Sequence, residues 1–296
     1  MSNPTGPNLT GSDLLAPDTH MGAVTLRVAD LATMTAYYRD AVRLAVLSDV
    51  AGTVTLGRGR TPIVVLEHAP ELQRASPRQA GLFHTAVLFE TEADLAASVY
   101  AVAQAHPGTF TGSADHLVSK AFYFTDPEGN GVELYWDRDR TEWSWTHGRV
   151  EMASLFLDPN AYLRDHLDPV ALAGADQRPA SVGHVHLCVG DVDSARDFYV
   201  DRLGFETMAE WQGQALFVSA GKYHHHMAMN TWNSAGAGRR RATLGLGLVR
   251  IELPATDDLG ALGERLAHHR VPVADDGQAV RFDDPWGNRL EVSVKA

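Results

Sequence analysis

Residues 126–134 read DPEGNGVEL, and residues 284–292 read DPWGNRLEV, 158 positions further along the chain. Asp-Pro-x-Gly-Asn is turn chemistry, because proline presets one backbone angle and glycine and asparagine accept left-handed conformations. The glutamate that follows each turn, Glu133 or Glu291, lies in an otherwise apolar run that predicts a strand. Two copies of this turn and strand indicate an internal repeat.

A second repeat links the N-terminal part of the chain to its middle. Residues 23–31 read AVTLRVADL and residues 184–192 read HVHLCVGDV, at an offset of 161. In both copies a short alternating strand runs into an aspartate, Asp30 or Asp191. An aspartate directly before an apolar-periodic stretch predicts a helix N-cap.

The repeats divide the chain into four units, each consisting of a strand, a helix and about three strands. GLFH at residues 81–84 aligns with GLGL at residues 245–248, so strands also begin the second and fourth units. The units lie near residues 20–70, 81–140, 182–232 and 242–294. In chain order we predict a flexible N-terminal tail over 1–18, an N-terminal domain with modules one and two over 19–140, a connector with a short helix over 141–181, and a C-terminal domain with modules three and four over 182–296.

Composition and charge exclude several classes of protein. Hydrophobic residues make up 45% of the 296 residues, as expected for a globular chain. The net charge of −12 argues against nucleic acid and anionic membranes as partners. A single cysteine, Cys188, allows neither an intramolecular disulfide nor a thiolate-rich metal site. With no signal peptide and no apolar run near the ~20 residues that span a bilayer, we expect a cytoplasmic protein.

The four-unit pattern with Asp-Pro-x-Gly-Asn-x-x-Glu resembles the vicinal oxygen chelate superfamily, which contains glyoxalases, bleomycin resistance proteins and extradiol dioxygenases. Within it, the chain is most similar to catechol 2,3-dioxygenase-like proteins, over nearly all of residues 20–294. The resemblance implies an α+β fold in which four βαβββ modules form two paired open-barrel halves. It also implies metal ligands on first and last strands, which here are the positions Ala23, His84, His184 and Leu248, and Glu133 and Glu291.

Only one pairing of modules collects a complete ligand set. If modules two and three pair, His84, Glu133 and His184 share one site, and modules one and four form a metal-free half. Two histidines and one carboxylate on a single face are the ligands of non-heme Fe(II) oxygenases. Pairing in chain order would leave each half with one histidine and one glutamate. His186, which shares a strand face with His184, is an alternative ligand.

The resemblance implies three further residues around the metal. His225 corresponds to the acid–base histidine, in a segment over residues 223–228 that we interpret as a strand. Strand alternation would place His225 on the face opposite to its two neighbouring histidines. Tyr123, ten residues before Glu133, corresponds to a tyrosine that hydrogen-bonds a substrate oxygen, and His116 corresponds less closely to a second substrate histidine.

These residues predict an Fe²⁺-dependent extradiol dioxygenase that inserts O₂ into a catechol-like substrate, with Mn²⁺ as the alternative metal. The expected partners are a small aromatic diol and O₂, and exposed sheet edges favour a homo-oligomer. Two other interpretations stay open at this stage. One is a glyoxalase-type metal-dependent isomerase, lyase or transferase, and the other is a metal-free resistance protein that binds small molecules.

Overall fold

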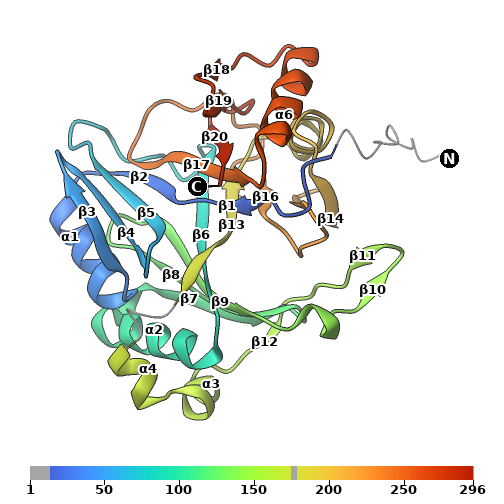
Figure 1. Ribbon diagram of the computed structural model, residues 1–296. Helices are drawn as coiled ribbons and strands as arrows, with labels where there is room; N and C mark the ends of the chain where they lie inside the picture. Colours follow the sequence, from blue (N-terminus) through green and yellow to red (C-terminus); the bar gives the residue numbers. More distant parts are fainter. Residues whose placement is uncertain (1–13, 175–178, 296) are drawn as a thin grey trace.

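Four copies of a strand–helix–three-strand module make up most of the chain, as Figure 1 shows. The fold is that of a computed structural model in which residues 14–174 and 179–295 are described. Module one comprises β2 (Val24–Val28), α1 (Leu31–Ala36), η2 (Tyr37–Ala41), β3 (Ala45–Val50), β4 (Thr53–Arg58) and β5 (Thr61–His68). Module two comprises β6 (Gly81–Phe89), α2 (Glu92–Ala105), η3 (Pro107–Thr109), β7 (Phe110–Asp115), β8 (Ser119–Thr125) and β9 (Gly131–Asp137).

The second half of the chain repeats this order. Module three comprises β13 (Ala180–Cys188), α5 (Val192–Arg196), η6 (Asp197–Arg202), β14 (Glu206–Trp211), β15 (Ala215–Ser219) and β16 (Met227–Asn230). Module four comprises β17 (Gly245–Leu253), α6 (Thr256–His268), β18 (Ala274–Asp275), β19 (Ala279–Asp283) and β20 (Arg289–Val294).

The modules pair two with three and one with four, as the ligand set predicted. One large sheet has the order β12-β7-β8-β9-β6-β13-β16-β15-β14, and the other has the order β18-β19-β20-β17-β2-β5-β4-β3. Within each module the first and last strands are parallel neighbours, and the first strands of paired modules are antiparallel. The predicted α+β fold of four modules in two paired halves is therefore confirmed.

The predicted helix caps are confirmed in both odd-numbered modules. The side chain of Asp30 accepts a hydrogen bond from the amide of Thr33, and that of Asp191 accepts one from the amide of Ser194. Each bond satisfies an amide that would otherwise lack an intrahelical partner. Both helices then change from α to π geometry, as η2 and η6.

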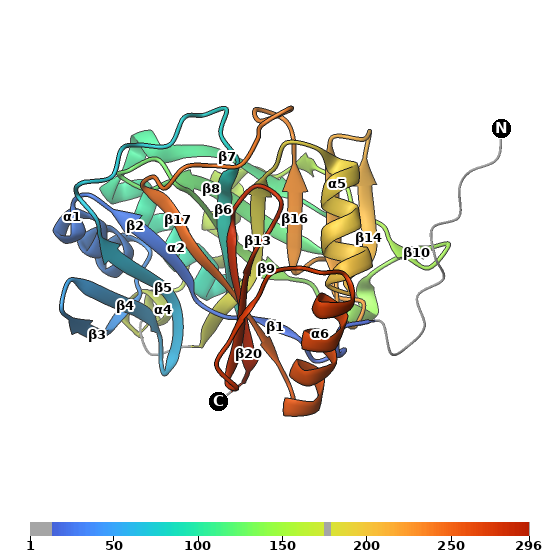
Figure 2. The ribbon, with the colours of Figure 1, turned by 90° about the horizontal axis from the view of Figure 1, so that it is seen from above.

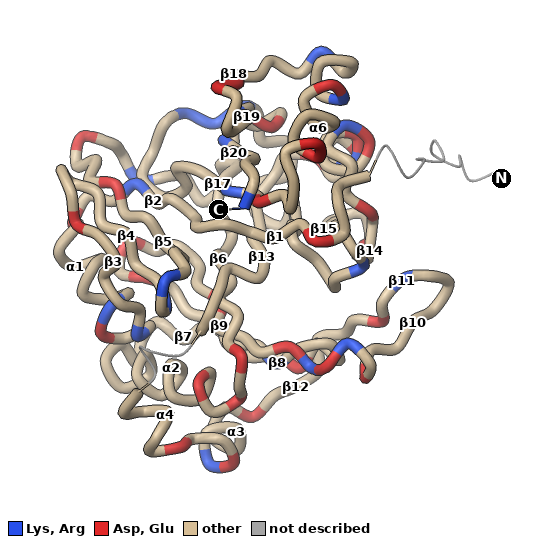
Figure 3. The backbone as a smooth tube through the Cα atoms, in the orientation of Figure 1, with Lys and Arg blue, Asp and Glu red and all other residues tan. Residues whose placement is uncertain are grey.

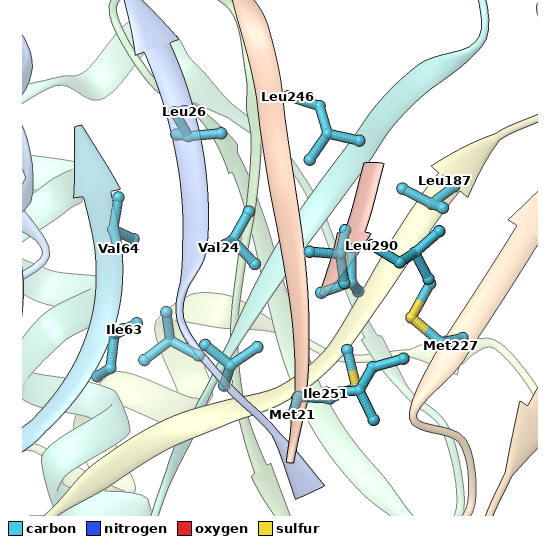
Figure 4. Close-up of a cluster of buried hydrophobic side chains, with 14 of the residues drawn as sticks. Met21, Val24, Leu26, Ile63, Val64, Leu187, Met227, Leu246, Ile251 and Leu290 are labelled. Carbon is cyan, nitrogen blue, oxygen red and sulfur yellow. The ribbon is translucent and has the colours of Figure 1, made fainter. Parts of the chain in front are cut away.

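Apolar side chains at the centre of each sheet and between the two sheets hold the fold together. The strands β6 and β13, side by side at the centre of their sheet, contain no Lys, Arg, Asp or Glu, and Figure 3 shows most of the charge on loops and element ends. Behind them, side chains from β2, β5 and β17 meet Leu187 of β13 and Met227 of β16 in one core, seen in Figure 4. In Figure 2, α1 and α2 lie on one flank and α5 and α6 on the other.

The segments outside the modules attach to these sheets. Residues 1–13 of the predicted tail lie outside the described residues, whereas Leu15 is buried and its amide donates to the carbonyl of Gly204. The connector contains η4 (Arg140–Glu142), β10 (Trp145–Thr146), β11 (Arg149–Val150), β12 (Leu155–Phe156), α3 (Pro159–His166) and α4 (Pro169–Gly174), and β1 (His20–Met21) pairs with β17. No helix in the described ranges is both long and apolar enough to span a bilayer.

Candidate metal centre

Three neighbouring strands, β9, β6 and β13, bring together the three predicted ligands. The Nε2 atom of His84 lies 2.9 Å from Oε2 of Glu133, and Nε2 of His184 lies 3.0 Å from the same oxygen. One ligand atom from each residue lies within 4.8 Å of the other two, and all three residues are buried. Within residues 14–174 and 179–295 this is the one group of three or more such side chains that converges in this way.

Strand register explains why the three side chains converge. Ala86 of β6 lies opposite Glu133 on the parallel strand β9 and opposite His184 on the antiparallel strand β13. Cross-strand partners share a face, and His84, two residues before Ala86, shares that face too. The methyl group of Ala86 is therefore the floor between the two flanking ligands, and its small size leaves room for an ion.

A β-bulge in β13 places His184 on the ligand face. The register shifts between Val182 and His184, so that Gly183 is an extra residue with no partner in β6. A Cβ atom at Gly183 would lie only 1.6 Å from the hydroxyl oxygen of Tyr135. Glycine is required here because the phenol of Tyr135 packs directly on the bulged backbone.

The protonation states suit a divalent cation. Burial alone would raise the pKa of Glu133, but the charges of His184 and His84 and the hydrogen bond with His184 outweigh it and hold that pKa well below its usual value. Burial lowers the pKa of His184 to about 4, against the opposing effect of Glu133. Near neutral pH the site thus presents a carboxylate and a neutral imidazole, the forms that metals bind.

Nε2 of buried His84 also has no hydrogen-bond partner, despite its closeness to Glu133. An ion between these groups would satisfy that nitrogen, so the residues present fit a metal site.

The equivalent place in the other sheet is filled by an arginine. Arg250 of β17 lies opposite Glu291 of β20, in the register that Ala86 has with Glu133. Nε of Arg250 donates to one oxygen of Glu291 at 2.8 Å, and Nε of Arg281 donates to the other at 2.5 Å. Two guanidinium groups thus neutralise Glu291, with no histidine at the site, so the second Asp-Pro-x-Gly-Asn-x-x-Glu sequence forms an ion-pair cluster.

The histidines at residues 224–226 do not form a strand, which corrects the sequence prediction. They lie in an irregular segment, and β16 begins only at Met227. Without strand alternation, His224 and His225 turn to the same side, and their Nδ1 atoms are 2.8 Å apart. His226 instead packs away, where its Nδ1 accepts a hydrogen bond from the amide of Ala220. The ring of His225 lies 4.1 Å from that of His184, centroid to centroid, and is therefore beside the ligands.

Tyr123 and His116 form a hydrogen-bonded pair beside the triad. Tyr123 is the cross-strand neighbour of Glu133, and its hydroxyl lies 2.7 Å from Nε2 of His116. Nδ1 of His116 lies 2.7 Å from the carbonyl oxygen of Ala153, which can only accept. The proton of a neutral His116 is therefore on Nδ1, and Tyr123 donates to Nε2. Burial and the charge of Glu133 raise the pKa of Tyr123 well above its usual value, so the phenol stays protonated.

His186 lies next to the triad but has a different partner. Its Nε2 atom is 2.9 Å from the side-chain amide of Asn230, and its ring packs on Phe83 and Trp232. These contacts direct Nε2 away from the converging ligand atoms, so the structure favours His184 as the third ligand. Phe83 and Trp232, with Phe217, which lies against His225, form an aromatic wall at the site.

Two surface hollows lie away from the three predicted ligands. One of about 160 Å³ is bordered by Arg27, Arg240 and Arg289, and one of about 370 Å³ is bordered by Arg239 and Arg281. Both lie against the sheet of modules one and four. The centre at His84 is therefore identified by the geometry of its ligand atoms and not by the size of a hollow.

Comparison with known proteins agrees with this arrangement. The model of the glyoxalase/bleomycin resistance protein/dioxygenase superfamily matches residues 20–134 and 181–292, most of all four modules. The chain belongs to this superfamily. This superfamily member is 30% identical to the catechol-2,3-dioxygenase of Bacillus subtilis strain 168 over 279 residues, which cover 90% of the chain and 94% of that protein.

Two solved structures share the fold of this superfamily member. A putative dioxygenase from Bacillus subtilis subsp. subtilis strain 168 superposes with a TM-score of 0.59 at 15% identity, over 93% of this chain and 84% of the other. Glyoxalase I from Zea mays superposes with a TM-score of 0.56 at 14% identity, over 94% and 92%. At such identities these likenesses concern the fold alone.

Ala86, Gly183 and Asp137 are among the site residues of this superfamily member that the sequence analysis did not single out. Ala86 and Gly183 act by being small, and only strand register shows what a larger side chain would meet. Asp137 ends β9 four residues after Glu133, on the same face of that strand, and its carboxylate contacts His224. In the sequence, the spacing of four residues between Glu133 and Asp137 in one predicted strand could have indicated that both lie on the same face.

Proposed function

We propose that this chain is a metal-dependent extradiol dioxygenase that opens a catechol-like ring, with Fe²⁺ (or Mn²⁺) held by His84, Glu133 and His184. The observation that carries the proposal is the buried convergence of these three ligand atoms within 4.8 Å. Two imidazoles and one carboxylate on one face leave the remaining metal positions for substrate and O₂. The 30% identity to a catechol-2,3-dioxygenase supports this choice of reaction.

The surrounding residues suit the binding of an aromatic diol. A bound Fe²⁺ would supply Lewis acidity toward the diol and one-electron chemistry toward O₂. When Tyr123 donates its proton to Nε2 of a neutral His116, its phenolic oxygen can accept a hydrogen bond from a substrate hydroxyl. The wall of Phe83, Trp232 and Phe217 offers edges and faces on which a flat ring can pack.

His225 is the residue placed to move a proton. Burial, together with the neighbouring His184 and His224, lowers the pKa of His225 well below its usual value, so it enters the reaction neutral. A neutral imidazole beside the ligands can take a proton from a substrate hydroxyl and return it during ring opening. We therefore assign His225 the acid–base role and Tyr123 with His116 the positioning of the substrate oxygen.

The test is anaerobic reconstitution with Fe²⁺ followed by a panel of catechols, with O₂ uptake and the yellow ring-opened product as readouts. Glu133→Gln and His84→Ala should lose bound iron and turnover together, because each leaves two ligands. Glu291→Gln is the matched control and should keep both, because Glu291 is paired with Arg250 and Arg281. Iron retained at full occupancy in Glu133→Gln would contradict the triad.

The same experiment separates the two competing functions. A protein that binds metal at the triad but takes up no O₂ with any catechol would point to an isomerase or transferase reaction. A protein that binds no divalent metal would point to a small-molecule binder.

A further inference from the structure

A hydrogen-bonded chain leads from the centre to a carboxylate near the surface. Nδ1 of His225 lies 2.8 Å from Nδ1 of His224, and Nε2 of His224 lies 2.9 Å from Oδ1 of Asp137. The other oxygen of Asp137 accepts a 2.6 Å hydrogen bond from the hydroxyl of Tyr223. That hydroxyl in turn contacts the hydroxyl of Tyr135 at 2.8 Å. The Asp137 carboxylate is thus held on both oxygens.

The donors and acceptors of this hydrogen-bonded series determine which nitrogen of His224 and of His225 carries the proton. The Asp137 carboxylate only accepts, so the hydrogen of His224 is on Nε2. A neutral His224 then has a bare Nδ1, which must accept, and the donor at 2.8 Å is the Nδ1–H of His225. His225 therefore keeps its proton on Nδ1 and has a lone pair on Nε2.

We propose that Asp137, acting through His224, is a positioning residue that holds His225 as its Nδ1–H tautomer and so presents Nε2 as the proton acceptor. This inference rests on the proposed acid–base role of His225. One strand then serves both purposes, because β9 carries Glu133 to the metal and Asp137, on the same face, to the histidine pair.

The Nε2–H tautomer of His225 would require a positively charged His224. For His225 to carry its proton on Nε2, His224 would have to donate from Nδ1 as well as from Nε2. His224 would then be a buried imidazolium, paired with Asp137 but also next to the imidazoles of His184 and His225. The neutral His224 avoids that positive charge beside two other imidazoles. A carboxylate that orients a neighbouring histidine in this way is a recurrent device of acid–base catalysis.

The direct test is the tautomeric state of His225, read from two-bond ¹H–¹⁵N correlation spectra of protein labelled on its histidine side chains. The spectra are recorded on the metal-free protein and on the protein loaded with diamagnetic Zn²⁺, and are assigned with His224→Gln and His225→Gln. We expect His225 as the Nδ1–H tautomer and His224 as the Nε2–H tautomer. Observation of Nε2–H on His225 in the unmodified protein overturns the proposal without reference to any activity.

The informative variant is Asp137→Asn. Its amide can donate to Nε2 of His224, which moves the His224 proton to Nδ1 and forces His225 to the Nε2–H form. We expect this inverted tautomer pair, retained metal, and a loss of about 10²- to 10⁴-fold in kcat on the best catechol with little change in KM. Asp139→Asn is the matched control, an exposed aspartate two residues further on that contacts Thr141, and it should change neither tautomer nor kcat.

The outcomes distinguish this proposal from the proposed function. An unchanged tautomer pair or an unchanged kcat in Asp137→Asn overturns the role of Asp137. If no catechol is turned over by the unmodified protein, the dioxygenase assignment fails, while the spectra still decide whether Asp137 sets the tautomer of His225.

Discussion

The residue next to the glutamate differs between the metal-binding sheet and its look-alike. Ala86 and Arg250 occupy the same place relative to Glu133 and Glu291 in their two sheets. With alanine, the space next to the glutamate is open to two histidines, whereas with arginine a guanidinium fills it and pairs with the carboxylate. Together with the absence of histidine at the positions of Ala23 and Leu248, this arginine makes Glu291 part of an ion-pair cluster and not a ligand.

Ala86→Arg should abolish metal binding without removing a ligand. The guanidinium would lie between Glu133 and His184 and form an ion pair with Glu133, as Arg250 does with Glu291. We expect metal content by elemental analysis to fall by more than about tenfold, while circular dichroism shows a folded protein. Leu248→Ala, on the same face of the other sheet, is the control and should leave metal content unchanged. Full metal occupancy in Ala86→Arg would contradict the assignment of the site.

At the scale of elements, the repeated Asp-Pro-x-Gly-Asn turns join consecutive modules. The hydroxyl of Tyr38 donates to Asp126, and that of Tyr199 donates to Asp284, each at 3.0 Å. The same carboxylates accept backbone amides within their own turns. The tyrosines come from the π-helical segments η2 and η6, so each odd-numbered module is fastened to the turn of the next module. The repeat of these residues at matched offsets is thus a requirement of the fold.

Tyr199→Phe should lower the free energy of unfolding by about 1–3 kcal/mol, because the buried Asp284 carboxylate loses one of its donors. Denaturant titration followed by circular dichroism measures the change. Tyr100→Phe on α2, where the side chain is exposed, should shift the free energy by less than about 0.5 kcal/mol. Equal effects of the two substitutions would show that Tyr199 does not fasten the modules.

At the scale of the whole molecule, several histidines are buried in the neutral form. Burial, with smaller effects from His224 and His20, lowers the pKa of His226 to about 3. Burial also lowers the pKa of His186 and His225 well below the usual value. As the pH falls below about 6.5, the unfolded chain takes up protons that the folded protein does not accept. Folding stability is therefore full above that pH and decreases toward acid.

His226→Asn should flatten this acid dependence in the metal-free protein, because the amide oxygen replaces Nδ1 as the acceptor for Ala220 and does not titrate. Between about pH 6 and pH 4, each such histidine contributes a slope of about 1.4 kcal/mol per pH unit. Unfolding free energies measured at several pH values should show the slope reduced by about that amount. His268→Asn, at an exposed position, serves as control, and a slope unaffected by His226→Asn would contradict the neutral burial of His226.

Several features were determined by the sequence alone, because they depend on residues close together in the chain. Strand alternation, the capping aspartates Asp30 and Asp191, and the turn residues at 126–130 predicted the modules and their order. Their repetition placed His84, Glu133 and His184 at equivalent module positions. The pairing of modules two and three followed from ligand counting, not from any local pattern.

Only the tertiary structure decided which groups meet around those ligands. The register across β9, β6 and β13 brings Ala86 between Glu133 and His184, and the bulge at Gly183 turns His184 toward them. The irregular path of residues 224–226 places His224 between His225 and Asp137, against the alternation that a strand would impose. These contacts join residues up to a hundred positions apart. They depend on cross-strand register and side-chain volume, which local sequence patterns do not specify.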